Sequence, residues 1–256
     1  MKTKEFNGVQ VYVGGLANIA ADIDELLSLR KTIRLHLCNA YTFALTLESP
    51  ELHSTLISAE LNLPDGLPLS KVISPFENVQ IRGMELLSTL MKSSKTSSSS
   101  HVFYGVREGE IELFEQKLRN LFGSDIRIHT VSAPYANLEE LNIGEFRDVL
   151  ESLKPDYIWI GLGTPKQDFL VDKVFEWTMY PCAIIPVGAV FDFVLGATPQ
   201  APNFMRKIGL EWLFRLVKEP RRLIKRYTKY NIIFAWQVLR FIWQRLCIEI
   251  DRFKRS

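Results

Sequence analysis

Short apolar runs alternate with longer amphipathic segments along most of this chain of 256 residues, and few folds accommodate that order. Residues 33–38, 101–106 and 126–131 have the length and composition of buried strands, whereas residues 108–122 and 143–153 show helical three- and four-residue spacing. Strands separated by helices form parallel sheets covered on both faces, because each connecting helix returns the chain across the sheet. The sequence therefore predicts an α/β fold with a Rossmann-like, mostly parallel sheet and helices on both faces.

The same patterns predict the remaining elements. We expect an edge or entry strand at residues 9–13, further strands at 157–160 and 182–187, helices at 19–30 and 40–47 and from Pro50, and a strand, turn and helix over 78–91. The polar residues 92–100 read as a surface loop, because strands and helices continue to alternate beyond it. After Pro202 only helices are predicted, at residues 204–217 and 231–252.

The strand predicted at residues 157–160 ends in a glycine turn that opens a helix. Gly161 and Gly163 allow the backbone to pass close to a ligand, and Pro165 suits the first helical position. The unpaired N–H groups and positive dipole end of that helix favour a diphosphate. Lys166 stands where a dinucleotide fingerprint has its third glycine, and no Gly-Lys-Ser/Thr follows, so neither common nucleotide motif is present. An ordinary strand-to-helix turn without a ligand is the alternative.

Three further candidate side chains lie at predicted strand ends or in a rigid loop. Asn39 follows the strand at residues 33–38, where open α/β sheets bind ligands, or it is simply a helix N-cap. Asp65 stands in the Pro64-Asp65-Gly66 turn, which suits either a plain turn residue or a general base held in place. Gly188 and Asp192 follow the strand at 182–187, and Asp192 is either a ligand contact or a helix cap.

The sequence predicts neither a metal site nor a cofactor. Asp22 and Asp24 match the Asp-x-Asp of many sugar transferases, but they stand in the first turn of a predicted helix, where acidic side chains suit the dipole. The histidines share no ligand spacing: His36, His53, His101 and His129. The three cysteines lie far apart in apolar runs, which favours buried free thiols.

Charge is unevenly distributed along the chain. Residues 206–256 contain 14 Lys/Arg and 4 Asp/Glu, a net charge of +10, whereas the whole chain has a net charge of only +2. An acidic body with a basic tail favours a polyanionic partner, and because no nucleic-acid motif accompanies the charge, we expect an anionic membrane surface. Neither a signal peptide nor a membrane span is predicted, so we expect a cytoplasmic protein, peripheral on the inner face of the cell membrane.

The last predicted helix carries an apolar stripe beside basic and amide side chains. The stripe repeats at three- and four-residue intervals through Ile232, Trp236, Leu239, Trp243, Leu246 and Ile250, and the other face carries Gln237, Arg240, Gln244, Arg245 and Arg252. This pattern is typical of a helix lying in the membrane interface, although packing on the protein's own body or on a second copy, as a homo-oligomer, is the alternative. We therefore expect an α/β catalytic domain at 1–204 and a helical, basic, membrane-associating appendage at 205–256.

Several motifs in one order resemble those of the WecG/TagA/CpsF glycosyltransferase family over nearly the whole chain. They are Asn39, Pro64-Asp65-Gly66, Gly161-Leu162-Gly163-Thr164-Pro165-Lys166-Gln167, the segment 187–193, Ala201-Pro202, the segment 209–216 and Glu219-Pro220-Arg221-Arg222. Three positions depart from the family pattern, namely Leu37 for a threonine, Gln200 for an arginine and Asp168 for a glutamate. The first two change polar contacts near the expected pocket.

The resemblance implies an inverting, metal-independent transfer of a sugar from a UDP-sugar to a polyprenyl-diphosphate-linked sugar acceptor. The pathways implied build exopolysaccharide, teichoic acid or surface antigen, with glucose, N-acetylmannosamine or N-acetylmannosaminuronate as the donor sugar. Asp65 would be the base, with Asn39 beside it, and the appendage would meet the membrane and help to close the site. The implied substrate-binding residues are Gly161, Gly163, Thr164, Pro165, Gln167, Gly188, Asp192, Arg215 and Arg222.

Two rival functions are considered. A non-catalytic nucleotide-sensing or membrane-adaptor module could use the same sheet and tail, but it would not need Asp65. A dinucleotide oxidoreductase is disfavoured by the missing third glycine and by the lack of a placed acidic ribose ligand.

Overall fold

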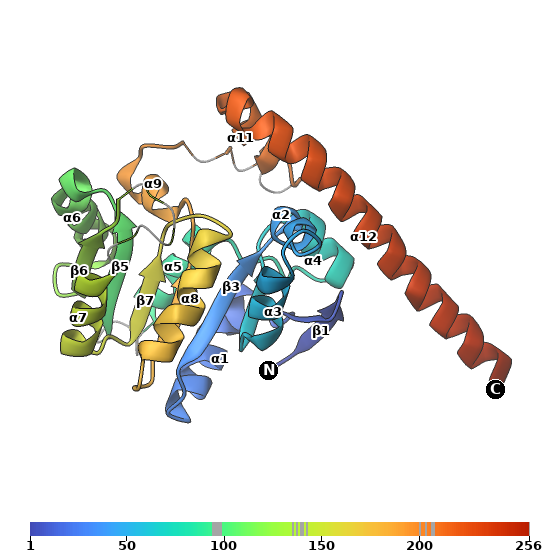
Figure 1. Cartoon of the computed structure of the whole chain (residues 1–256), viewed down its shortest axis with the longest axis horizontal. Coiled ribbons are helices and arrows are strands. Elements are labelled where there is room, and N and C mark those ends of the chain that lie inside the picture. The colour runs from blue at the N-terminus through green and yellow to red at the C-terminus, as the bar shows by residue number, and fades with distance from the viewer. Residues whose placement is uncertain are drawn as a thin grey trace.

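The computed structural model describes residues 1–93, 99–134, 136, 138, 141, 143–199, 201–202, 204–205 and 208–255, without the side chains of Arg222 and of residues 248–255. These residues form an eight-stranded sheet in the order β1-β2-β4-β3-β8-β7-β5-β6. Only β1 runs antiparallel to its neighbour, and every other pairing is parallel. The predicted α/β class and mostly parallel sheet are therefore confirmed (Figure 1).

The strands are short and almost all buried. Their bounds are β1 Thr3–Phe6, β2 Val9–Tyr12, β3 Ile33–Cys38, β4 Leu61–Pro64, β5 Ser100–Val106, β6 Arg127–Ser132, β7 Tyr157–Ile160 and β8 Ala183–Pro186. Alternate residues of β7 enter different clusters: Tyr157 and Trp159 join one, and Ile158 and Ile160 join another. Because side chains alternate along a strand, these clusters are the cores on the two faces of the sheet.

Helices cover both of these faces. One face packs against α1 Leu16–Ser28, α5 Gly83–Lys92, α6 Ile111–Phe122 and α9 Val190–Leu195, and the other against α7 Gly144–Leu153 and α8 Lys166–Trp177. A third cluster involves α2 Ala40–Leu45, α3 Pro50–Ser58, α4 Leu67–Ile73 and the last helix, α12 Pro220–Arg255, which α11 Glu211–Lys218 precedes. The predicted covering of both faces is thus confirmed.

The N-terminal strand β1 was not predicted. Asn7 and Gly8 have φ of 51° and 82°, the positive values that a two-residue turn between antiparallel strands requires. The turn pairs Thr3–Phe6 with Val9–Tyr12, so β1, rather than β2, is the edge strand. A hairpin this short has too few alternating residues for a reliable periodic signal.

The strand predicted near residue 78 is wrong. Val79 and Ile81 are buried, which produced the strand-like pattern, but no sheet pairing includes them. The backbone N–H of Ile81 donates to the carbonyl of Pro64 at 2.9 Å, and the chain then enters α5 at Gly83. This extended segment therefore runs beside the Asp65 turn as a buried loop.

The helix α12 is one continuous element of 36 residues that lies along α2 and projects past the N-terminal hairpin (Figure 1). One of its faces completes a core cluster in which Phe6 contacts Phe234 and Phe241, with ring centroids 6.0 and 5.0 Å apart. Gln237, predicted on the solvated face, is instead only 1% exposed, because its Nε2 donates to the carbonyl of Phe43 at 3.0 Å.

The predicted apolar stripe occupies the opposite side of α12. Its described members are all exposed, by 48% to 69%: Ile232, Trp236, Leu239, Trp243 and Leu246. The helix thus has two apolar sides, one packed on the body and one open to solvent. The predicted division into residues 1–204 and 205–256 is therefore a division of proposed roles. The two parts are not separate packing units, because one core cluster contains residues from both.

Replacing Phe234 should reveal how much the body depends on α12. We expect Phe234→Ala to lower the free energy of unfolding by about 3 to 5 kcal/mol, because it opens a cavity against Phe6. Trp243→Ala, on the exposed stripe of the same helix, should change it by less than about 0.5 kcal/mol. Urea unfolding of both variants measures the difference. Equal, small effects would mean that α12 does not stabilise the body.

Candidate functional site

The predicted site residues gather at one edge of the sheet because they follow four neighbouring strands. Asp65 follows β4, Asn39 follows β3, Gly188 follows β8, and Gly161 and Gly163 follow β7, and these strands are adjacent in the order β4-β3-β8-β7. Parallel strands end at the same side of a sheet, so residues far apart in sequence meet there. This carboxyl-end edge is where open α/β sheets bind ligands.

Asn39 is both a helix cap and a partner of Asp65. Its Oδ1 accepts from the backbone N–H groups of Tyr41 and Thr42 at 2.9 and 3.2 Å, so the cap occupies the oxygen of the amide. The amide nitrogen is left to donate, and the Asn39 side chain forms a hydrogen bond with Asp65. The two interpretations of Asn39 are therefore compatible, since capping fixes the orientation that serves the carboxylate.

The Asp65 carboxyl lies in a partly enclosed setting between opposing charges. Burial and the nearby carboxylate of Glu211 raise its pKa to about 6, while Arg215, Arg82 and the hydrogen bond from Asn39 act in the lowering direction. The backbone N–H of Asp65 donates to the carbonyl of Cys38 at 2.7 Å, which ties the turn to the end of β3. A carboxyl with a raised pKa in a fixed turn is suited to accept a proton near neutral pH.

Two arginines and one glutamate act on this carboxyl, and a second glutamate pairs with one of the arginines. Arg82 approaches Glu85 at 2.9 Å and Glu211 at 3.8 Å, and Arg215 contacts Glu211 at 3.0 Å. Glu211 and Arg215 belong to α11, so the segment before α12 supplies one wall of the site. The structure thus places Arg215 near Asp65.

The approach of α11 depends on Gly209. Gly209 has a φ of 77°, and a Cβ atom built there would lie 2.8 Å from Cδ2 of Leu67, which follows the Asp65 turn. Only glycine combines that backbone conformation with such close contact. The chain therefore passes tightly over the start of α4 before α11 begins.

Gln167 fastens the two glycine turns together. Its Oε1 accepts from the backbone N–H groups of Gly163 and Gly188, each at 2.9 Å, and the side chain is only 4% exposed. The predicted neighbourhood of the two turns is confirmed, since β7 and β8 pair directly. Both N–H groups are occupied by this amide, which identifies Gln167 as a residue that sets the shape of the turns.

The two glycines of the first turn serve different purposes. A Cβ atom at Gly161 would lie 2.4 Å from the ring of Phe191, so packing alone requires glycine there. Gly163 has a φ of 78° and open space around a built Cβ atom. The turn is therefore open at Gly163, whereas at Gly161 it packs against Phe191.

The helix after this turn starts one residue later than predicted. Pro165 is the N-cap of α8 and follows a cis peptide bond from Thr164, both residues being partly exposed, and Lys166 is the first helical residue. Asp192 lies in the first turn of α9, where its side chain makes no capping hydrogen bond, and its carboxylate is 3.9 Å from Arg107. Arg222 lies in the first turn of α12, and its side chain is outside the description.

Two of the three departures from the family pattern have a packing explanation. Asp168 is 1% exposed and contacts Nδ1 of His36 at 2.8 Å, so it joins α8 to β3 beneath the site. Leu37 is buried in the core and its side chain lies within 3.2 Å of a Cβ atom built at Gly83. Gln200 lies outside the described residues.

No group of three or more His, Cys, Asp or Glu side chains in the described part of the chain is arranged to hold a metal ion. Asp22, from the Asp-x-Asp match, accepts a hydrogen bond of 2.5 Å from the hydroxyl of Tyr12 and lies within α1. Asp22 lies well inside α1, whose first turn has no acidic side chain, so the predicted first-turn position is wrong. The hydrogen bond with Tyr12 accounts for its carboxylate instead.

Comparison with known proteins identifies the family. The profile of the glycosyl transferase WecG/TagA/CpsF family matches residues 5–247. The chain belongs to this family. It is also 29% identical over 181 residues to an N-acetylglucosaminyldiphosphoundecaprenol N-acetyl-beta-D-mannosaminyltransferase of Bacillus spizizenii, covering 69% of this chain and 67% of the relative.

No role for Arg82 or Glu211 was predicted from the sequence, although Glu211 lies in the family segment 209–216. Arg82 precedes a glycine at a helix start and forms part of no local motif. It reaches the site because the backbone of Ile81 is hydrogen-bonded to Pro64, one residue before Asp65. One feature could have drawn attention to Arg82: it is the N-cap of α5, where the helix dipole disfavours a basic residue.

The raised pKa of Asp65 has a measurable effect on stability. A folded-state pKa of about 6, above the ordinary 3.8, means that the folded protein holds this proton more tightly, so stability should fall as pH rises from about 4 to about 6. Asp65→Asn removes this ionisation. The melting temperature of the variant minus that of the wild type should therefore increase as the pH rises from about 4 to about 6. Carboxyl NMR titration of the wild type should give an apparent pKa near 6. A pKa close to 3.8 and a constant difference in melting temperature would contradict the assignment.

Proposed function

We propose that this protein is an inverting, metal-independent glycosyltransferase that moves a sugar from a UDP-sugar to a polyprenyl-diphosphate-linked sugar acceptor. The observation that carries the proposal is a single carboxyl, Asp65, held with a raised pKa between Arg82 and Arg215 at the ligand-binding edge of the sheet. Membership of the WecG/TagA/CpsF family and the name of the Bacillus relative support the reaction class and the lipid-linked acceptor. The process served is the synthesis of a cell-surface polysaccharide.

In this mechanism, Asp65 acts as the general base. Its carboxylate takes the proton from the acceptor hydroxyl as that oxygen bonds to the anomeric carbon of the donor sugar. The bond between this carbon and the diphosphate oxygen breaks at the same time, and UDP leaves with the bonding electrons. A single displacement of this kind inverts the configuration at the anomeric carbon. The Asn39 hydrogen bond to Asp65 keeps the carboxylate aimed at the acceptor.

The diphosphate gains negative charge as it leaves and needs compensation. The charges of Arg215 and Arg82 act on the pKa of Asp65, and both arginines form ion pairs with Glu211. The open turn at Gly163 and Thr164, followed by the positive end of the α8 dipole, gives the diphosphate a surface to approach. Gln167 supports this surface and ties Gly188 to it, and Asp192 and Arg222 are the remaining proposed substrate contacts. These arginines and backbone dipoles would perform the charge neutralisation that a metal ion provides elsewhere.

A lipid-linked acceptor requires the site to lie at a membrane surface. None of the described helices is both long and apolar enough to cross a bilayer. The exposed stripe of α12 and the net charge of +10 in residues 206–256 instead favour attachment at the interface, where each basic residue gains about 1 kcal/mol near anionic lipid. We therefore propose a peripheral protein on the cytoplasmic face of the membrane. The Bacillus relative favours N-acetylmannosamine as the donor sugar over glucose or N-acetylmannosaminuronate.

Transfer from UDP-N-acetylmannosamine to a short-chain lipid-diphosphate N-acetylglucosamine acceptor tests the reaction directly. We expect the wild type to be active in excess EDTA, and Asp65→Asn to reduce kcat by a factor on the order of 10² or more while donor binding is kept. Below about pH 6, kcat/KM of the wild type should fall as Asp65 becomes protonated. Near-normal turnover by Asp65→Asn would leave a non-catalytic binding module as the better description. Activity that is lost in EDTA and restored by magnesium or manganese would contradict metal independence.

Substitution at the open glycine tests where the donor binds. Gly163→Val fills the space above the turn and should weaken UDP binding in calorimetry by a factor on the order of 10 or more. Gly123→Val is a matched control, because Gly123 also has a positive φ and open space but ends α6. Both variants should lose similar stability, and only Gly163→Val should lose affinity. Equal UDP affinity in the two variants would place the nucleotide elsewhere.

A further inference from the structure

The two arginines proposed for the diphosphate share one carboxylate. Nη2 of Arg215 donates to Oε1 of Glu211 at 3.0 Å, and Nε of Arg82 lies 3.8 Å from Oε2 of the same side chain. Arg215 and Glu211 belong to α11, whereas Arg82 precedes α5, so this carboxylate joins two separate parts of the chain. Carboxylates and phosphates both accept paired hydrogen bonds from guanidinium groups. Glu211 therefore occupies these arginines much as a phosphate of the donor would.

Each arginine also has a support other than the shared carboxylate. Nη1 and Nη2 of Arg82 donate to Glu85 and Gln80, each at 2.9 Å. The guanidinium group of Arg215 lies over the ring of Phe193 in α9, 5.2 Å from its centroid. These contacts can keep both guanidinium groups in place while the shared carboxylate is exchanged for another anion.

Glu211 is placed to leave the arginines without becoming a buried charge. Its side chain is 28% exposed, and those of Arg82 and Arg215 are 20% and 37% exposed, so a ligand can reach all three. Glu211 is the first residue of α11, where the positive end of the helix dipole stabilises an acidic side chain. A bound diphosphate has the same sign of charge, so repulsion would move this carboxylate towards water.

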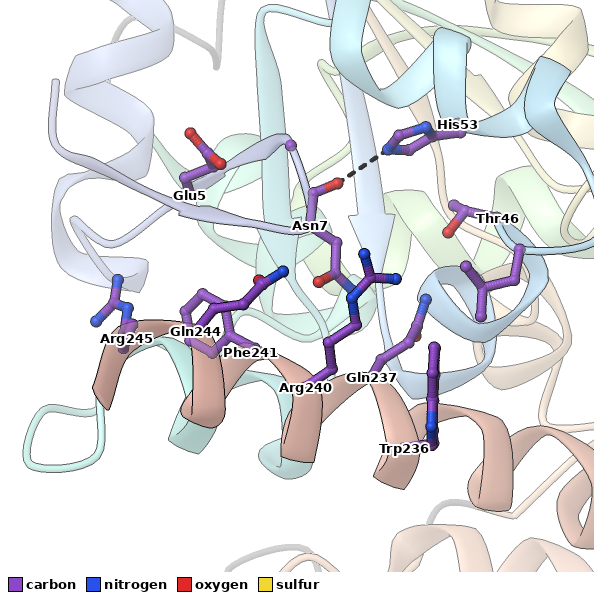
Figure 2. A pocket seen from close by; sticks show the side chains of 12 residues that line it. Glu5, Asn7, Thr46, His53, Trp236, Gln237, Arg240, Phe241, Gln244 and Arg245 are labelled. Atoms are coloured by element: carbon purple, nitrogen blue, oxygen red, sulfur yellow. Dashed lines mark hydrogen bonds between the residues drawn. The ribbon is translucent and has the colours of Figure 1, made fainter. Parts of the chain in front are cut away.

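Two other arginines of the basic tail are held in a different way. Arg240 and Arg245 line a cavity between α12 and the N-terminal hairpin, together with Trp236 and Phe241 (Figure 2). Their guanidinium groups lie 5.6 and 4.5 Å from the centroids of these two rings. An aromatic ring holds an arginine without competing with an anion for its N–H groups, whereas a carboxylate does compete. Glu211 thus places a competitor at the two arginines proposed for the diphosphate.

We propose that Glu211 is an exchangeable counterion of the donor site. It holds Arg82 and Arg215 between turnovers, yields them to the diphosphate of the UDP-sugar, and takes them back as UDP leaves. No covalent bond forms or breaks at Glu211, because only ion pairs are exchanged. This inference rests on the proposed function and adds a positioning residue whose competition weakens the binding of both donor and UDP.

Neutralising Glu211 should therefore tighten the binding of a diphosphate. Glu211→Gln keeps the size of the side chain but removes the charged competitor, so we expect pyrophosphate and UDP to bind about 10 times more tightly in calorimetry. Uridine lacks the diphosphate and should bind equally to the variant and the wild type. Glu85→Gln removes the same charge from another partner of Arg82 and should change UDP affinity by less than about twofold. Thermal unfolding checks that both variants are folded.

Steady-state transfer distinguishes exchange from simple support of the arginines. With Glu211→Gln, the KM for the UDP-sugar should fall and inhibition by the product UDP should strengthen about 10 times, because the arginines are free to hold the diphosphate. If Glu211 only supports the arginines, its replacement should instead raise the KM and weaken inhibition by UDP.

The outcomes separate this inference from the proposed function. Unchanged or weaker UDP binding by Glu211→Gln would overturn the exchange, and transfer by the wild type would still support the proposed function. Equal tightening in Glu85→Gln would also overturn it, because local charge alone would explain the effect. Tighter pyrophosphate binding by Glu211→Gln without any transfer by the wild type would keep the exchange and contradict the transferase. A lack of pyrophosphate and UDP binding in all three proteins would overturn the exchange.

Discussion

One amide oxygen joins two of the turns at the carboxyl-end edge of the sheet. Oε1 of Gln167 accepts from Gly163 and from Gly188, so the loops after β7 and β8 are joined at a single buried point. Both glycines have positive φ, and without a shared acceptor two such turns would have independent shapes. The buried contact of the next residue, Asp168, with His36 on β3 extends the same anchoring to the strand that leads to Asn39. The site is thereby built on rigid strand ends.

The other half of the site depends on capping. Because Oδ1 of Asn39 caps the start of α2, its amide nitrogen faces Asp65. The hydrogen bonds that begin this helix therefore also orient the side chain next to Asp65. The catalytic proposal and the fold therefore share residues. Glu211 in α11 adds a carboxylate that raises the pKa of Asp65 and orients Arg82 and Arg215. The segment that begins the basic tail therefore also sets the charge around Asp65.

Much of this arrangement could be predicted from the sequence because it follows from periodicity and turn residues. Residues 157–160 ending in Gly161 predicted β7 and its turn, and the Pro64-Asp65-Gly66 turn predicted a fixed carboxylate. Arg82 was missed because only tertiary packing of an extended loop brings it to Asp65. Gln237 was misplaced because α12 has two apolar faces, and a periodic pattern cannot say which of them the body covers.

The contact between Phe6 and Phe241 also constrains the order in which the chain matures. These rings pack together although nearly the whole polypeptide separates them. At translation rates of about 5 to 20 residues per second, the first hairpin waits on the order of 10 to 50 seconds for its covering helix to be synthesised. During that interval the apolar side of the hairpin lacks its final cover, a state that invites chaperones. The N-terminus, although made first, is therefore among the last parts to reach its native surroundings.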